Sequence, residues 1–212
     1  MNIKHIKPDD IEKRSMEIIE SELGDTSHLT DSEKQIVKRV IHTTADFDYL
    51  QNLKFSENAV ESGLQAIRSG TAIITDTNMS LAGISKPALK ALGCEVFCFT
   101  ADNDVAESAR SNGTTRAVAA VDKAANLFGN KNFIYAVGNA PTALIRLHEL
   151  IEQNMISPAL IIGVPVGFVN VVRSKDLIMT NDIPYIVAKG RKGGSTVAAA
   201  ICNALLYQLY KR

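Results

Sequence analysis

The sequence has few cysteines, no excess of charge of either sign and no long hydrophobic run. Its 212 residues include three cysteines, and 23 lysines and arginines balance 23 aspartates and glutamates. Three thiols fit a reducing compartment, and a net charge of zero argues against a general nucleic-acid binder. No apolar stretch reaches the roughly 18 residues of a membrane span, and the first residues lack the apolar run of a secretory signal. We therefore expect a globular, cytoplasmic protein.

The cysteines and histidines do not form a metal-binding pattern. Cys94 and Cys98 lie in a strand-like run, Cys202 lies in a helical stretch rich in alanine and leucine, and the four histidines are scattered. A zinc site needs a fourth ligand and tighter spacing. We expect thiols that pack in the core and no metal site.

The phosphate-binding motifs are also absent. No strand-like run is followed by Gly-x-Gly-x-x-Gly, and neither Gly-x-x-x-x-Gly-Lys-Ser/Thr nor Gly-x-Ser-x-Gly occurs. Pro165 stands between Gly163 and Gly167 and lacks the N–H that a phosphate would need. The sequence therefore argues against a nucleotide-binding module, which remains a rival interpretation.

Continuous apolar runs alternate with helical patterns along most of the chain. The strand-like runs are 71–76, 95–99, 132–137, 159–162 and 185–188. The helical stretches are 8–23, 31–44, 56–68, 86–92, 104–111, 115–128, 141–153, 168–177 and 195–210. This alternation predicts a single α/β domain, doubly wound, with a mainly parallel five-stranded sheet and helices on both faces. We expect the sheet core over 70–212 and an N-terminal helical arm over 1–69, in which 47–54 is either a strand or an irregular link.

Small residues gather in the loops that follow these strands. In doubly wound sheets the ligand binds beyond the carboxyl ends of the strands, where Gly138, Asn139 and Gly167 fall. The last such loop carries Arg191, Lys192, Gly193 and Gly194 ahead of a helix start, which suits a carboxylate or phosphate. Arg116 also opens a helix and can hold an anion. The alternative for Arg191 and Lys192 is a solvated turn.

Arg39 and His42 share one face of the helix predicted over 31–44. They are three residues apart and lie away from the apolar arc of Ile36, Val37, Val40 and Ile41. A permanent cation beside a side chain that exchanges a proton near neutral pH can bind an anionic ligand and move one proton. The alternative is a solvated helix end, with the histidine near the negative end of the helix dipole.

Five motifs, in this order along nearly the whole chain, closely resemble the precorrin-8X methylmutase family and its anaerobic counterpart, cobalt-precorrin-8 methylmutase. They are Arg39-x-x-His42, Asn112-Gly113-Thr114-Thr115-Arg116, Gly138-Asn139-Ala140-Pro141-Thr142-Ala143-Leu144, Gly163-x-Pro165-Val166-Gly167-Phe168-Val169 and Gly190-Arg191-x-Gly193-Gly194-Ser195.

The resemblance implies an isomerase of cobalamin biosynthesis. A methyl group migrates from C-11 to C-12 of the corrin macrocycle, giving hydrogenobyrinate or cobyrinate. The reaction uses no cofactor, and cobalt is present only if the substrate carries it. The family's proposed acid matches His42, and its substrate contacts match Ser15, Arg39 and Arg116. Ser85 replaces a family threonine.

The resemblance also implies a homodimer with the pocket near the subunit interface, and a polycarboxylate tetrapyrrole as the substrate. Two alternatives stand beside these implications. The alternative for Ser15 is a small residue that lets another helix approach, with its hydroxyl bonded to the carbonyl four residues earlier. The alternative for the activity is a non-catalytic tetrapyrrole carrier with the same pocket.

Overall fold

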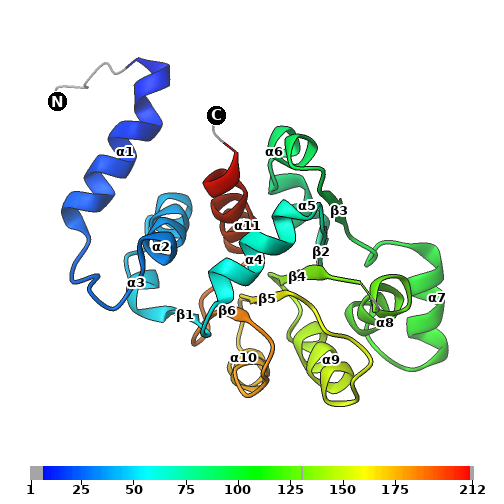
Figure 1. The fold of residues 1–212 in the computed structure, drawn as a ribbon. Coiled ribbons are helices and arrows are strands. Elements are labelled where there is room, and N and C mark those ends of the chain that lie inside the picture. The colour runs from blue at the N-terminus through cyan, green and yellow to red at the C-terminus, as the bar shows by residue number, and fades with distance from the viewer. Residues whose placement is uncertain (1–6, 130, 211–212) are drawn as a thin grey trace.

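A computed structural model describes residues 7–129 and 131–210, which form one mixed sheet with helices on both faces (Figure 1). The strands are β1 (Leu53–Phe55), β2 (Ala72–Thr75), β3 (Glu95–Phe97), β4 (Phe133–Val137), β5 (Leu160–Gly163) and β6 (Tyr185–Ala188). The helices are α1 (Pro8–Glu22), α2 (Asp31–Thr44), α3 (Tyr49–Asn52), α4 (Ala59–Arg68), α5 (Asn78–Gly83), α6 (Lys86–Ala91), α7 (Asn103–Ser111), α8 (Arg116–Phe128), α9 (Pro141–Glu152), α10 (Val171–Ile178) and α11 (Ser195–Leu209).

The strand order is β1-β6-β5-β4-β2-β3, and all neighbours are parallel except β1 and β6. The predicted fold class is confirmed, but the strand count of five is wrong, because the sheet has six strands. The additional strand pairs antiparallel with β6, Leu53 opposite Ala188. It has only three residues, so its own pattern is too short to show alternation, and its pairing with β6 defines it.

Each face of the sheet has its own apolar core. On β4, Ile134 and Ala136 join the core formed with α2, α4, α6 and α11, while Phe133, Tyr135 and Val137 join the core formed with α7 to α10. This is the two-residue alternation of a strand buried on both sides. None of the helices in 7–129 and 131–210 is long and apolar enough to cross a bilayer.

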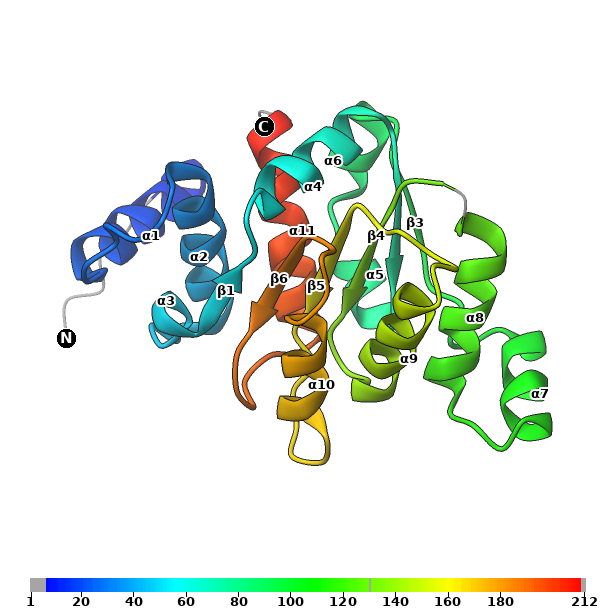
Figure 2. The same cartoon turned by 60° about the horizontal axis from the view of Figure 1, so that its bottom comes forward.

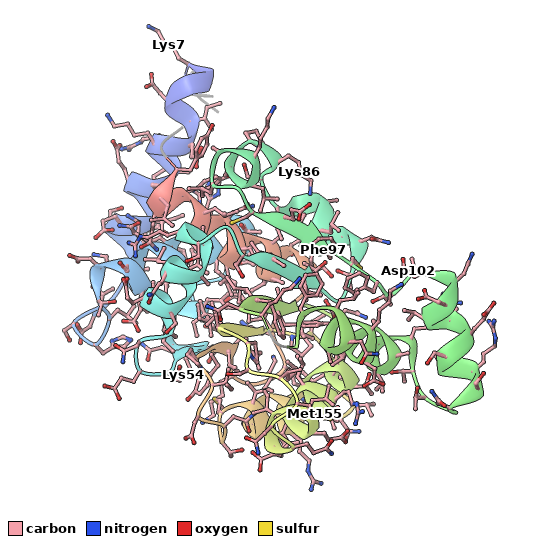
Figure 3. The ribbon with its side chains drawn as sticks, turned by 45° about the vertical axis from the view of Figure 1, so that its right-hand side comes forward. Lys7, Lys54, Lys86, Phe97, Asp102 and Met155 are labelled. Carbon is pink, nitrogen blue, oxygen red and sulfur yellow. The ribbon has the colours of Figure 1, made fainter. Side chains whose placement is uncertain are left out.

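The N-terminal helices differ in how they meet the sheet domain. Helix α2 begins with the predicted capping box, in which Thr30 and Glu33 bond each other's backbone N–H, and it packs along α11. Helix α1 lies outside α2 and carries Glu20, which pairs with Lys34 and Lys38. Its start, marked by Lys7, points away from the rest of the molecule (Figure 3).

The carboxyl ends of the parallel strands form one edge, and the loops that follow β5 and β6 lie along it (Figure 2). The chain order reverses between β2 and β4, which is the point where such sheets bind ligands. Asp76, directly after β2, is buried there and accepts hydrogen bonds of 2.8 Å from the N–H groups of Gly138, Asn139 and Ala140. Burial raises the pKa of Asp76, and the three N–H donors oppose that rise.

Helix α11 starts against the turn that Asp76 holds. A Cβ on Gly138 would lie 2.7 Å from Ser195 Cα and 2.9 Å from Ser195 N, so the residue there has to be glycine. The Ser195 hydroxyl lies 2.8 Å from Thr77 Oγ1, and Ser80 Oγ donates to Ser195 O at 3.1 Å. These contacts fix the first turn of α11 beside the end of β2.

We predict that Gly138→Ala destabilises the fold by about 1–3 kcal/mol, because the added methyl group meets backbone atoms that cannot rotate away. Thermal and urea unfolding followed by circular dichroism measure the change. Gly24→Ala is the matched control, since its Cβ would meet only Leu50 Cδ2 at an ordinary 3.7 Å. Equal stability of the two variants would contradict the close approach described here.

Candidate active site

Helix α2 presents Arg39 and His42 outside the core, as its spacing predicts. His42 is exposed in the last turn, and the buried residues of the helix are Ile36, Val37, Val40 and Ile41. Arg39 is half-buried: its Nη1 lies 2.7 Å from Glu12 Oε1, and its guanidinium carbon lies 5.3 Å from the centre of the Tyr207 ring. The cation is therefore held between α1 and α11.

A cavity of about 250 Å³ runs from this face of α2 to the start of α11. Arg39 and Thr43 line it from α2, and His42, three residues after Arg39 and one before Thr43, lies outside its lining. The other lining residues are Gly83, Thr196, Ala199, Ala200, Asn203 and Tyr207. A cavity of this size is below the range of about 300–1,000 Å³ that encloses small molecules.

The hydroxyls of the two candidate serines each make a hydrogen bond to the backbone of a helix. Ser85 is the N-cap of α6, where its hydroxyl accepts from Ala88 N at 3.5 Å. Its own N–H donates to Asn203 Oδ1 at 2.8 Å, which places it beside the cavity wall. Ser15 donates its hydroxyl hydrogen to Ile11 O at 2.9 Å, so the bond expected for a structural serine is present.

The loop after β6 lies against the loop after β5. Gly194 N donates to Val164 O at 2.8 Å, and a Cβ on Gly193, whose φ is 157°, would lie 2.1 Å from the same oxygen. Gly167 N donates to Arg191 O at 3.2 Å. These glycines let the two loops touch, and they bring the Gly167 turn to Arg191.

Arg191 itself is exposed and lies over an aromatic ring. Its guanidinium carbon is 5.3 Å from the centre of the Phe168 ring, and 82% of Phe168 is accessible. A cation above an exposed ring combines charge with a flat apolar surface, which suits a ligand that has both. Phe168 belongs to one of the five motifs, but the sequence does not show that its ring is exposed. That exposure makes the ring a candidate contact for a ligand.

Lys192, expected to offer a free charge, is paired. Its Nζ lies 2.6 Å from both Asp46 Oδ2 and Asp48 Oδ2. The hydrogen bond from Lys192 lowers the pKa of Asp46, and the two carboxylates raise the pKa of Lys192. The pair joins the end of α2, four residues after His42, to the loop that holds Arg191.

The remaining candidates, Gly138, Asn139 and Arg116, lie along the carboxyl edge of the sheet but away from Arg39 and His42. Gly138 and Asn139 give their N–H groups to Asp76, so these donors are not available to a ligand. Arg116 is exposed at the first position of α8, and Thr115 before it lies 3.0 Å from Thr142 at the start of α9. That is the face of the sheet opposite α2, so a single chain does not place Arg116 beside His42.

Sequence reasoning missed two buried charges at this edge, Asp76 and Lys175. Lys175 is entirely buried on α10, between Val171 and Ile178 on the same stripe. Lys175 lies four residues after Val171 and three before Ile178, and this helical spacing predicts that its side chain lies on the buried face of the helix.

The thiols and acidic groups leave no metal site in the described part of the chain. Within 7–129 and 131–210, no group of three or more histidines, cysteines, aspartates and glutamates could hold an ion. Cys94 and Cys202 are buried, as predicted for core thiols, and Cys98 is half-buried. That the chemistry uses no cofactor stays a prediction.

Comparison with known proteins agrees with the resemblance seen in the motifs. The family model described as precorrin-8X methylmutase matches residues 10–208. A cobalt-precorrin-8 methylmutase from Leptospira interrogans is 44% identical over 208 residues, with 95% of this chain and 94% of the relative covered. One from Salmonella typhimurium is 44% identical over 207 residues, covering 96% of each chain.

Relatives named for the metal-free substrate, precorrin-8X, match as well, and so do solved structures. A precorrin-8X methylmutase from Pseudomonas aeruginosa is 36% identical over 198 residues, covering 92% of this chain and 93% of the relative. The crystal structure of precorrin-8X methylmutase from Thermus thermophilus superposes with a TM-score of 0.84 at 42% identity, covering 93% of this chain and 96% of that one.

We predict that Asp46→Asn lowers the free energy of unfolding by about 0.5–1 kcal/mol at pH 7, the range of partly exposed ion pairs. Because the folded state lowers the pKa of Asp46, the stabilisation is complete above the ordinary aspartate pKa of about 4 and is lost as the pH falls through the lowered value. Urea unfolding of both proteins between pH 7 and pH 3 measures the convergence. Asp182→Asn, at an exposed position, serves as the control, and a difference between wild type and Asp46→Asn that does not shrink at low pH would contradict the pairing.

Proposed function

This chain belongs to the precorrin-8X methylmutase family, and on that premise we propose which of its residues carry out the reaction. It is an isomerase of cobalamin biosynthesis. A methyl group moves from C-11 to C-12 of precorrin-8X or cobalt-precorrin-8, giving hydrogenobyrinate or cobyrinate. Relatives carry both substrate names, so both forms of the substrate belong in the assay.

The substrate is a wide apolar ring fringed with acetate and propionate arms, and the carboxyl edge offers matching groups. Arg191 lies on the Phe168 ring, so one guanidinium can hold a carboxylate while the ring contacts the macrocycle. Arg39 lines the cavity next to the first turn of α11. We assign these groups to binding and orientation, together with Ser85 at the start of α6 and Arg116 at the start of α8 on the opposite face of the sheet. Holding the arms supplies the orientation that an intramolecular migration requires.

We propose that His42 is the acid. It is exposed, it is in the last turn of α2, and Asp46 in the same segment is tied to the anion-binding loop. Protonation of the ring system by His42 stabilises the transition state while the methyl group migrates. The proton returns afterwards, so the isomerisation leaves the enzyme unchanged. Help from a general acid is typically worth about 10²–10⁴ in rate.

No separate cofactor is needed for a proton donation and a migration within one molecule, so we propose that none is used. Cobalt, where present, enters as part of the substrate. We propose that the reaction takes place in the cytoplasm. A non-catalytic tetrapyrrole carrier is not favoured, because the matched relatives are named as methylmutases.

We predict that His42→Ala lowers kcat by about 10²–10⁴ and leaves product binding within about threefold, since the imidazole donates a proton but does not clamp the arms. Purified wild type and variant are incubated with precorrin-8X and with cobalt-precorrin-8, and the change in the visible spectrum is followed.

His28, an exposed histidine outside the proposed site, provides the control, and His28→Ala is expected to react at the wild-type rate. Turnover by His42→Ala at the wild-type rate would remove His42 from the role of acid. Spectra that never change with wild type, despite tight binding, would favour the carrier.

We further propose that the working unit is a homodimer with the substrate near the interface. The cavity beside Arg39 is about 250 Å³, too small to enclose a corrin. The loop after β5 also exposes a run of apolar side chains, including Phe168 and Val169, of which 82% and 77% are accessible. A second copy against this patch would complete a larger pocket and cover the apolar surface.

We predict that Val169→Glu shifts the protein from dimer toward monomer, because a charge in an apolar interface is costly to bury. Sedimentation velocity at several micromolar concentrations measures the shift. Met155→Glu is the matched control, since Met155 is similarly apolar and is 55% accessible outside this loop. A wild type that sediments as a monomer at every concentration would refute the dimer.

A further inference from the structure

Lys175 is a buried cation that the proposed chemistry leaves unused. It lies on α10 with none of its surface accessible. Its Nζ donates to Gly190 O and to Lys192 O, both at 2.8 Å, and within 7–129 and 131–210 it forms no ion pair with a carboxylate. Burial lowers its pKa to about 8. The charge of the neighbouring Asp176 opposes that shift, but a charge removed from water with no carboxylate bonded to it is unfavourable. Its place under this loop therefore calls for an explanation.

The two carbonyls that bond Lys175 fix the orientation of the loop. In a trans peptide unit, the C=O of one residue and the N–H of the next point in opposite directions, and none of the described peptide bonds is cis. Because Gly190 O and Lys192 O point toward Lys175, the N–H groups of Arg191 and Gly193 point away from it. Neither of these two N–H groups donates to a backbone acceptor in the described part of the chain.

These outward N–H groups stand next to the start of α11. The first N–H groups of a helix have no partner within the helix, and α11 begins at Ser195, two residues after Gly193. The loop therefore presents a row of donors, the exposed guanidinium of Arg191 and the helix dipole at one place. A buried ammonium directly beneath adds positive potential without occupying the surface.

We propose that Lys175 is a positioning residue for substrate binding, which holds the Gly190–Gly194 loop so that its N–H groups and Arg191 receive one carboxylate arm of the macrocycle. This inference rests on the proposed function, which assigns carboxylate binding to the same loop. Lys175 does not touch the substrate, and it acts through the carbonyls of Gly190 and Lys192.

The test compares Lys175→Met with Lys175→Gln. Methionine removes both the charge and the donors, so KM is expected to rise at least tenfold, while kcat changes less than threefold because His42 is untouched. The glutamine amide, one bond shorter, keeps two N–H donors and is expected to recover part of the KM. Lys90→Met, at an exposed lysine on α6, is the matched control and keeps both constants.

Hydrogen–deuterium exchange of the loop gives a second readout that does not depend on turnover. Amides of residues 190–194 are expected to exchange at least tenfold faster in Lys175→Met, with β4 and β5 unchanged. A wild-type KM in a variant with a loosened loop would overturn the inference, and so would a parallel fall in kcat and in the folded fraction for both variants. If wild type itself fails to isomerise the substrate, the proposed function fails instead, and the exchange result distinguishes the two.

Discussion

The carboxylate of Asp76 is the constraint on which the edge of this molecule depends. It ends β2, and it collects the three N–H groups of Gly138, Asn139 and Ala140 that follow β4. Those donors could otherwise face a ligand or water, and a buried carboxylate without them would be costly. The turn is thereby closed at the point where the strand order reverses. Helix α11 can then begin in contact with Gly138.

From that fixed turn the functional groups divide between two structures. Helix α2 carries Arg39 and His42 along the side of α11, and the loop after β6 carries Arg191 beside the exposed Phe168. Lys192 joins them through Asp46 and Asp48. The pair is partly exposed and contributes little to stability, but it links the end of α2, where we propose that His42 donates a proton, to the loop that we propose binds a carboxylate. Because these groups are spread along the edge, they suit a ligand as broad as a corrin better than a compact ligand that a single deep pocket would enclose.

The sequence was sufficient for features that arise locally or repeat. The capping box at Thr30 and Glu33, the face shared by Arg39 and His42, and the parallel strands with continuous apolar runs all follow from spacing. Features defined by a distant partner were not accessible in this way. Leu53–Phe55 is a strand only because β6 lies beside it, and the six residues of α5 are held by the contacts of Ser80 with Ser195. Likewise the donors of Gly138 and Asn139, which the loop composition assigned to a ligand, go to a carboxylate more than sixty residues away.

The central claim is that His42 and the Gly190–Gly194 loop act on the same bound macrocycle. Cobyrinate containing paramagnetic cobalt(II) broadens the NMR signals of nuclei near it, so a titration of the labelled protein reports both places at once. The account predicts that the His42 ring signals and the amide signals of Arg191 and Gly193 lose intensity along one curve with one Kd. Broadening of only one of these groups, or two curves with different Kd values, would contradict it.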